Sequence, residues 1–261
     1  MRRMKHAGLM TILLVTALLL AACPAGQGTT GGTGTGVTAV TVGTNAEYPP
    51  FESVDANGTI VGFDIDLLNA VGKAAGFTPQ FVNTRWDGIF VALAAGEFDA
   101  VASAVTITDD RKQTMSFSEP YFNAGQMIAV KQGSLIAKPA DLDGKKVGVQ
   151  LGTTGDIWLS ENTKAEVVRY DEITLAFQAL ANGDIEAIVN DAPTSADIIK
   201  ANPEWGVVLV GQPFTDEFYG IAVRTERADV LKAINDGLAK VRASGEYDQI
   251  YQKWFGTPPP K

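Results

Sequence analysis

The chain has 261 residues, a formal net charge of −9 at pH 7, and one histidine and one cysteine. A single cysteine excludes an internal disulfide framework, and an acidic chain repels the phosphates of nucleic acid, so we expect no nucleic-acid partner. The length allows one large domain or two of modest size.

The first 22 residues have the pattern of a secretory signal peptide. Three basic residues precede an apolar run over residues 9–20, which is too short to span a bilayer. Removal of residues 1–22 takes the net charge from −9 to −12 and removes His6, the single histidine. The exported part then has no imidazole, which excludes Ser–His and Cys–His nucleophile pairs and a His-ligated zinc site. Catalysis by carboxylates remains possible on this ground. We expect a binding protein with no metal and no cofactor, not an enzyme.

The signal ends in LAAC, which resembles a bacterial lipobox with Cys23 as the lipidated residue. The alternative is an ordinary signal peptide cut near Ala22, with Cys23 incidental. Residues 23–37 are rich in Gly and Thr, a composition typical of a flexible tether. We therefore expect an extracytoplasmic protein that is held at the cell membrane by a lipid.

Strands and helices alternate after the tether. Asp64 is the expected N-cap and Gly76 the expected C-cap of the first helix, and Gly96 follows the second. The expected elements are a strand in VTAVTVGTN, a helix in GFDIDLLNAVGKAAGF, a strand in TPQFVNT, a helix in DGIFVALAAG and a strand in FDAVAS. This alternation predicts a parallel α/β sheet.

The same order of elements restarts in DLDGKKVGVQLGTTGDIWLSE, which begins at residue 141. The expected elements are a strand in KKVGVQ, a Gly/Thr turn and helix, a strand in VVRY, a helix in EITLAFQALANG and a strand in IEAIVN. ALANGDIEAIVNDAP, residues 179–193, also repeats five of the first ten positions of ALAAGEFDAVASAVT, residues 92–106. Helix–Gly–strand junctions are common, so chance is an alternative. The shared order of flanking elements favours two lobes of similar α/β build.

The C-terminal region has an apolar helical stripe that we expect to pack on the first lobe. The chain then crosses between the lobes twice, near 123–126 and near 215–219, and two crossings form a hinge beside a cleft. We therefore assign residues 38–124 and 218–261 to lobe 1 and residues 125–217 to lobe 2.

The loops after the two repeated strands contain opposite charges. Thr106 and Arg111 follow the first strand, with Thr108 as the cap of a short helix, and Asp191 follows the second. Ligands of open α/β sheets bind beyond the carboxyl ends of the strands, so a free amino acid, with one carboxylate and one ammonium, matches this pair. The alternatives are that Arg111 pairs with a neighbouring surface aspartate and that Asp191 caps the following helix.

The chain resembles the polar amino-acid substrate-binding proteins of bacterial ABC importers over residues 40–256. The motifs are GTNAEYPPFE, GFDIDL, WDGIFVAL, TITDDRKQTMSFSEPY, VGVQLGTTGD, NDAP, YGIAV and YDQIYQKWFG. The resemblance implies a two-lobed, periplasmic-binding-protein-like fold of type II, in which two α/β lobes are joined by a two-stranded hinge. It also implies ABC permease subunits as partners.

The resemblance also implies roles for individual residues. Thr106 and Arg111 bind the ligand carboxylate and Asp191 binds the ammonium. Residues that assist at the carboxylate are Ala104, Thr153 and Thr154. Residues that surround the ligand side chain are Asn45, Glu47, Tyr48, Trp86 and Gln150, although Glu47 can equally point to solvent.

The aromatic rings at Tyr48 and Trp86 favour a cationic side chain, hence free L-arginine, or lysine to a lesser degree. Many binders of basic amino acids have an aspartate where this chain has Asn45, which leaves glutamine open. Two other functions use the same fold. One is a ligand-sensing module, and the other is a dehydratase with a carboxylate general acid, for which Glu47 is the candidate.

Overall fold

The computed structural model describes residues 36–260. The predicted signal peptide, the predicted lipidation site at Cys23 and most of the predicted tether lie outside the described residues. Two five-stranded sheets dominate residues 36–260. No helix within this range is both long enough and apolar enough to cross a membrane.

The first sheet has the strand order β5-β1-β6-β15-β7. Its strands are β1 (Ala39–Thr44), β5 (Thr78–Asn83), β6 (Ala100–Val101), β7 (Ser116–Phe117) and β15 (Ala222–Val223). β1 is parallel to β5 and β6, whereas β15 is antiparallel to β6 and β7. The prediction of a parallel sheet is therefore wrong at β15. The chain leaves the first sheet after β7 and returns to β15 directly from β14 (Glu217–Tyr219), so β15 does not belong to a strand–helix–strand unit of the kind that gives parallel neighbours.

The second sheet has the order β11-β10-β12-β9-β13. Its strands are β9 (Gln126–Lys131), β10 (Lys146–Gln150), β11 (Glu166–Tyr170), β12 (Ala187–Asp191) and β13 (Val207–Val210). β10 is parallel to β11 and β12, and β9 is antiparallel to β12 and β13. The two sheets thus share one order of strand directions. The repeated sequence segments end in β6 and β12, which occupy equivalent places, so the repeat reflects a common scaffold.

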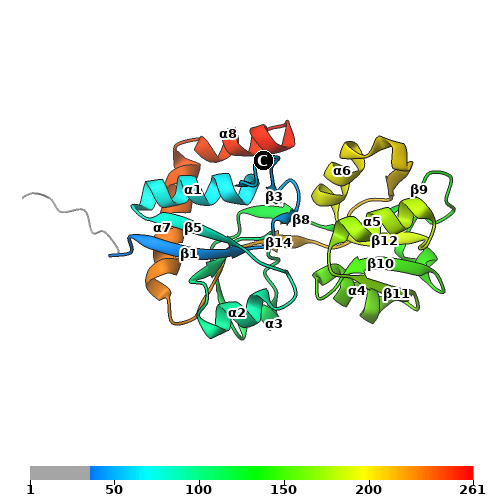
Figure 1. Cartoon of the computed structure of the whole chain (residues 1–261), viewed down its shortest axis with the longest axis horizontal. Helices are drawn as coiled ribbons and strands as arrows, with labels where there is room; N and C mark the ends of the chain where they lie inside the picture. Colours follow the sequence, from blue (N-terminus) through cyan, green and yellow to red (C-terminus); the bar gives the residue numbers. More distant parts are fainter. Residues whose placement is uncertain (1–35, 261) are drawn as a thin grey trace, which may run out of the picture. The chain divides into compact units, whose positions relative to one another are not determined.

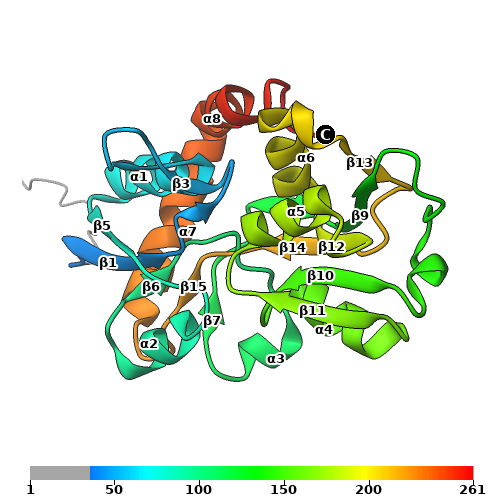
Figure 2. The same ribbon diagram turned by 45° about the vertical axis from the view of Figure 1, so that its right-hand side comes forward.

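Helices cover both faces of each sheet. They are α1 (Phe63–Ala75), α2 (Ile89–Ala95), α3 (Asp109–Lys112), α4 (Thr154–Asn162), α5 (Ile173–Asn182), α6 (Ala192–Ala201), α7 (Ala228–Ala243) and α8 (Glu246–Phe255), with 3₁₀ turns η1 (Pro139–Leu142) and η2 (Pro203–Trp205). Figures 1 and 2 show α1 and α2 on opposite faces of the first sheet, and α4 on the face of the second sheet that α5 and α6 do not cover. The C-terminal α7 packs on α1, as the apolar stripe predicts. A methyl group at Gly237 would lie 2.6 Å from the Val71 carbonyl oxygen.

A two-stranded antiparallel ribbon lies between the two sheets in Figure 1. It is formed by β8 (Phe122–Ala124) and β14, with Asn123 opposite Phe218. Both segments that the sequence predicted to cross between the lobes contain strands of this ribbon. The residue boundaries assigned to the two lobes remain a prediction.

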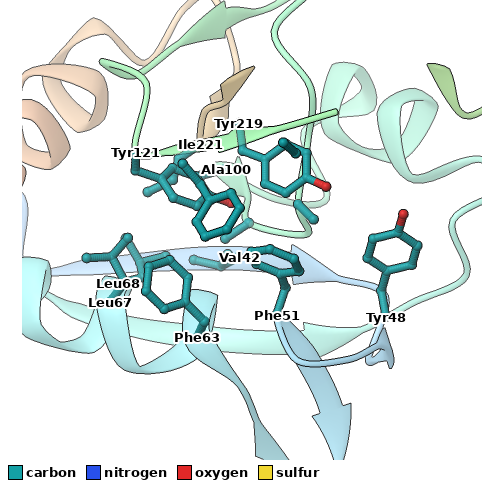
Figure 3. Close-up of a cluster of buried hydrophobic side chains, with 14 of the residues drawn as sticks. Val42, Tyr48, Phe51, Phe63, Leu67, Leu68, Ala100, Tyr121, Tyr219 and Ile221 are labelled. Carbon is teal, nitrogen blue, oxygen red and sulfur yellow. The ribbon is translucent and has the colours of Figure 1, made fainter. Parts of the chain in front are cut away.

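Aromatic side chains join the first sheet to this ribbon (Figure 3). The Phe51 ring lies 6.0 Å from Phe63, 4.9 Å from Phe122 and 5.1 Å from Tyr219, in each case edge to face. Phe51 lies in the turn between β2 (Glu47–Tyr48) and β3 (Glu52–Val54), which form a small antiparallel sheet with β4 (Ile60–Val61). This packing determines the direction of Tyr219 on β14, because edge-to-face pairs have a preferred geometry.

Asp64 is not the N-cap of α1, contrary to the prediction. The cap is Gly62, whose φ of 151° suits glycine, and a methyl group there would lie 1.9 Å from the Phe51 carbonyl oxygen. The buried Asp64 carboxylate instead accepts hydrogen bonds from the Ala104 N–H at 2.9 Å and the Tyr121 hydroxyl at 2.7 Å. Ala104 has a φ of 48°, which is unusual for a residue with a side chain. Asp64 thus holds the loop after β6 in a strained conformation.

A second buried carboxylate, Glu52, lies beneath the same loop. It accepts a hydrogen bond from the Ser103 hydroxyl at 3.0 Å, and that hydroxyl accepts one from the Asn45 N–H at 2.9 Å. Burial raises the pKa of Asp64 to about 7, and burial together with the Asp64 carboxylate raises the pKa of Glu52. The folded protein therefore retains protons on these groups at pH values where the unfolded chain has lost them.

The buried carboxylates make stability depend on pH. Between about pH 4 and 7 the folded protein holds a proton on Asp64 that the unfolded chain releases, so stability should fall as the pH rises through this window. Urea unfolding at pH 5 and pH 8 measures the fall. Asp64→Asn should reduce it by about 1–3 kcal/mol, at roughly 1.36 kcal/mol per pKa unit. Asp66→Asn, which removes a half-buried carboxyl of the same helix turn that pairs with Lys253, is the control. An equal fall in the wild type and Asp64→Asn would contradict the assignment.

Candidate functional site

A cavity is lined by loops that follow strands of both sheets. Ten of the eleven residues that the sequence predicted for the ligand site line it: Asn45, Tyr48, Trp86, Ala104, Thr106, Arg111, Gln150, Thr153, Thr154 and Asp191. Glu52 and Ser103, which the sequence did not indicate, also line it. Glu47 is the remaining predicted residue, and it lines an adjoining cavity instead.

Arg111 is the cationic group of the cavity. It lies on the short helix α3, whose N-cap Thr108 accepts a hydrogen bond from the Arg111 N–H, as predicted. The guanidinium donates to the Thr106 carbonyl at 2.9 Å and lies 4.9 Å from the Phe90 ring centroid. Burial lowers the pKa of Arg111 to about 10, so the group remains charged at neutral pH. The alternative of a surface pair is not observed among the described residues, where Asp109 pairs with Lys112.

Asp191 is the anionic group of the cavity and ends β12. It occupies the N-cap position of α6, but no cap hydrogen bond from its side chain is found within residues 36–260. Its buried carboxylate accepts hydrogen bonds from the Tyr48 hydroxyl at 2.9 Å, from the Tyr219 hydroxyl and from the Gln126 side-chain amide. Burial, followed by the neighbouring Glu217 carboxylate, raises the pKa of Asp191 to about 6. The group is therefore ionised at neutral pH.

Trp86 and Tyr48 both line the cavity but also have partners in the protein. The Trp86 ring lies 5.5 Å from the Arg111 guanidinium, a cation–π arrangement that the sequence did not predict. The Tyr48 hydroxyl reaches across to the end of β12, where it lies 2.9 Å from both Asn190 and Asp191. Figure 3 shows Tyr48 beside the aromatic cluster. Both rings thus hold the charged residues in place.

The second sheet contributes Gln150, Thr153 and Thr154 to the cavity. The Gln150 side-chain amide lies 3.5 Å from the Asn45 side-chain oxygen, so the two halves meet here. Thr153 is the N-cap of α4 and accepts from the Asp156 N–H at 3.3 Å. Thr154 begins α4, and its hydroxyl donates to Glu217 at 2.7 Å.

The adjoining cavity shares Asn45 and Trp86 with the first. It is lined by three acidic residues, Glu47, Asp171 and Glu172, and by one basic residue, Arg85, which pairs with Asp171 at 2.5 Å. Burial and the neighbouring Glu172 carboxylate raise the pKa of Glu47 to about 7. A ligand group that reached this region would meet an acidic wall.

Sequence reasoning missed the polar residues of the hinge and of the strand beside it. Glu217 accepts hydrogen bonds from Thr106 at 2.9 Å and from Thr154 at 2.7 Å. Gln126 begins β9, and Tyr219 ends β14. The only available signal was their place within the two segments predicted to cross between the lobes. Clusters of histidine, cysteine and acidic residues that could hold a metal ion are not found in the described part of the chain.

Comparison with known proteins identifies the family. Residues 40–257 match the bacterial extracellular solute-binding proteins, family 3. The chain is 45% identical over 219 residues to a probable histidine-binding protein of Neisseria gonorrhoeae, with 82% of each chain covered. It is 35% identical over 222 residues to ABC transporter arginine-binding protein 1 of Escherichia coli (strain K12), with 83% of this chain and 90% of that protein covered.

A solved structure of an ancestral arginine-binding protein bound to arginine is 44% identical to this chain. Its TM-score is 0.80, and the match covers 84% of this chain and 98% of that one. These similarities confirm the predicted two-lobed fold of type II. The chain belongs to family 3 of the bacterial extracellular solute-binding proteins.

Proposed function

We propose that the protein binds a free polar amino acid between its lobes and delivers it to an ABC permease. The favoured ligand is L-arginine, with lysine or glutamine as the alternatives. The observation that supports this proposal is the presence of the Arg111 cation and the Asp191 anion in one cavity, on loops that follow equivalent strands. A zwitterion presents the complementary pair of charges.

Binding in this proposal closes a clamp. Side chains of the two halves already meet across the cavity, since the Tyr48 hydroxyl contacts Asp191 and the Asn45 and Gln150 side chains lie 3.5 Å apart. A ligand favours closure only through contacts that it makes better in the closed form than in the open form. A ligand that joins Arg111 to Asp191 would do so.

Arginine is favoured by two features. Trp86 offers an aromatic wall, and the acidic adjoining cavity lies beyond the side chain of Asn45. The name of the Escherichia coli relative and the ligand of the ancestral structure support this choice, whereas the Neisseria gonorrhoeae relative is named for histidine. A thermal-shift screen against arginine, lysine, histidine and glutamine tests the proposal, because bound ligand raises the melting temperature. If none of the four amino acids raised the melting temperature, the result would contradict amino-acid binding.

The remaining parts of the proposal concern location and partners. The predicted lipid on Cys23 and the tether that follows it would hold the protein at the outer face of a membrane, near its permease. A sensory role would use the same binding step, and a permease gene beside this one distinguishes transport from sensing. The relatives are named as binding proteins, and these names support a binding protein over a dehydratase.

Asp191→Asn should weaken arginine binding by about 2–5 kcal/mol, because the ligand ammonium would be buried without its counter-charge. Isothermal titration calorimetry measures the change. Asp197→Asn, on the following helix and half-buried, is the matched control and should leave the affinity within about twofold. Undiminished affinity in Asp191→Asn would remove this residue from the site.

Arginine affinity should also depend on pH. Below about pH 6 the Asp191 carboxylate of the free protein takes up a proton and no longer attracts the ammonium, so the affinity should fall as the pH is lowered. Below that pKa the arginine affinity should fall by about tenfold for each pH unit, because one proton must leave Asp191 when the ligand binds. Titrations from pH 4.5 to 8 test this expectation. A constant affinity over that range would contradict it.

Trp86→Ala should reduce arginine affinity more than glutamine affinity, by about 0.5–2 kcal/mol, if the ring contacts the ligand guanidinium. The contact between Trp86 and Arg111 is lost for both ligands, so the difference between them isolates the side-chain contribution. Paired calorimetric titrations measure it. Equal losses would show that the ring acts only on Arg111.

A further inference from the structure

The hinge strand β14 places a carboxylate between the two halves of the cavity. Glu217 is buried, with 9% of its surface exposed, and accepts hydrogen bonds from three threonine hydroxyls. The Thr106 hydroxyl lies 2.9 Å and the Thr154 hydroxyl 2.7 Å from one carboxylate oxygen, and the Thr215 hydroxyl lies 2.8 Å from the other. Thr106 follows the first sheet's β6, whereas Thr154 begins α4 of the second half.

These contacts determine what two cavity residues can offer a ligand. A threonine hydroxyl has one proton to donate and two lone pairs that accept. Thr106 and Thr154 donate that proton to Glu217, so each retains only acceptor capacity toward the cavity that both residues line. In this arrangement the Thr106 hydroxyl has no proton left to donate to the ligand carboxylate, to which the family resemblance assigns this residue.

The lining of the cavity contains three acceptors and one cationic donor group. The Asp191 carboxylate and the hydroxyl oxygens of Thr106 and Thr154 are acceptors, and Arg111 is the donor group. An α-ammonium is a donor in three directions and matches an acceptor-only wall, whereas a carboxylate matches the guanidinium. The two hydroxyls come from different halves of the fold, and their polarity depends on Glu217, which accepts from both.

We propose that Glu217 is a positioning residue that fixes the hydroxyls of Thr106 and Thr154 as acceptors for the ligand ammonium, beside Asp191. The proposal rests on the amino-acid binding function proposed above and deepens it. Glu217 does not touch the ligand in this arrangement, and it acts through the two hydroxyls. The ligand carboxylate is then recognised by Arg111.

The test compares three probes in the wild type and in Glu217→Gln. They are L-arginine, 5-guanidinopentanoate, which lacks the α-amino group, and agmatine, which lacks the carboxylate. The glutamine amide can donate to one hydroxyl and so reverse its polarity while it keeps the shape of the side chain. The preference for arginine over 5-guanidinopentanoate should fall at least about tenfold in the variant. The preference for arginine over agmatine should stay within about threefold. Competition calorimetry measures both ratios.

Asp216→Asn is the matched control. It removes the same charge one residue away, where Asp216 is partnered by the Asn123 side chain at 3.1 Å and contacts neither hydroxyl. Both ratios should be unchanged in this control. Thr106→Val, which keeps the shape of the residue and removes one hydroxyl, should lower the preference over 5-guanidinopentanoate even if Glu217→Gln fails to fold.

The outcomes separate the two proposals. An equal loss of affinity for all three probes in Glu217→Gln would show a purely structural role and overturn the inference. A change confined to the preference over agmatine would place the residue at the carboxylate and also overturn it. If the wild type binds no arginine, the arginine form of the proposed function fails and the inference fails with it. If the wild type binds arginine and both preference ratios are unchanged in Glu217→Gln, only the inference about Glu217 is contradicted.

Discussion

A buried carboxylate is the constraint on which the site depends. An ionised group away from water needs hydrogen-bond donors, and Asp191 obtains them from Tyr48, Tyr219 and Gln126. These donors belong to three places in the fold: a short strand beside the first sheet, the hinge ribbon, and the first residue of β9. One anion therefore brings together both halves and the hinge. A ligand cation that approaches it acts on the whole arrangement.

The repeated scaffold explains why opposite charges face one cavity. β6 and β12 occupy equivalent places in sheets with the same order of strand directions, so the loops after them leave equivalent edges. The scaffold is shared, but the loops differ. Arg111 follows one strand and Asp191 ends the other. Ligands of open α/β sheets bind beyond the carboxyl ends of the strands, and two such edges that line one cavity supply both charges of a zwitterion.

The polar residues beneath the site have a different task from the residues that line it. Asp64 holds the Ala104 N–H, and Glu52 holds the Ser103 hydroxyl, so the loop after β6 keeps one conformation. Glu217 does the same for hydroxyls of both halves. Such groups carry a cost of burial and are retained where a precise arrangement of donors and acceptors matters. Some of the acidic residues of this chain thus lie inside the protein and not on its surface.

The sequence by itself determined the features that local pattern controls. Alternating strands and helices, the glycine that ends α1, the cap at Thr108 and the repeat itself follow from apolar spacing and turn residues near one another in the chain. The ten predicted residues that meet in one cavity, Asn45 among them, followed from the resemblance to a family and the rule for strand ends.

Only the tertiary structure decided the direction of β15 and β9, the burial of Asp64, the place of Glu47 in an adjoining cavity and the role of Glu217. The reason is separation along the chain. The partners of Asp64 and Glu217 include residues 40 and 111 positions away, so no local pattern records them. Hydrogen-bond polarity in the cavity is set by contacts that exist only once the two halves and the hinge have come together.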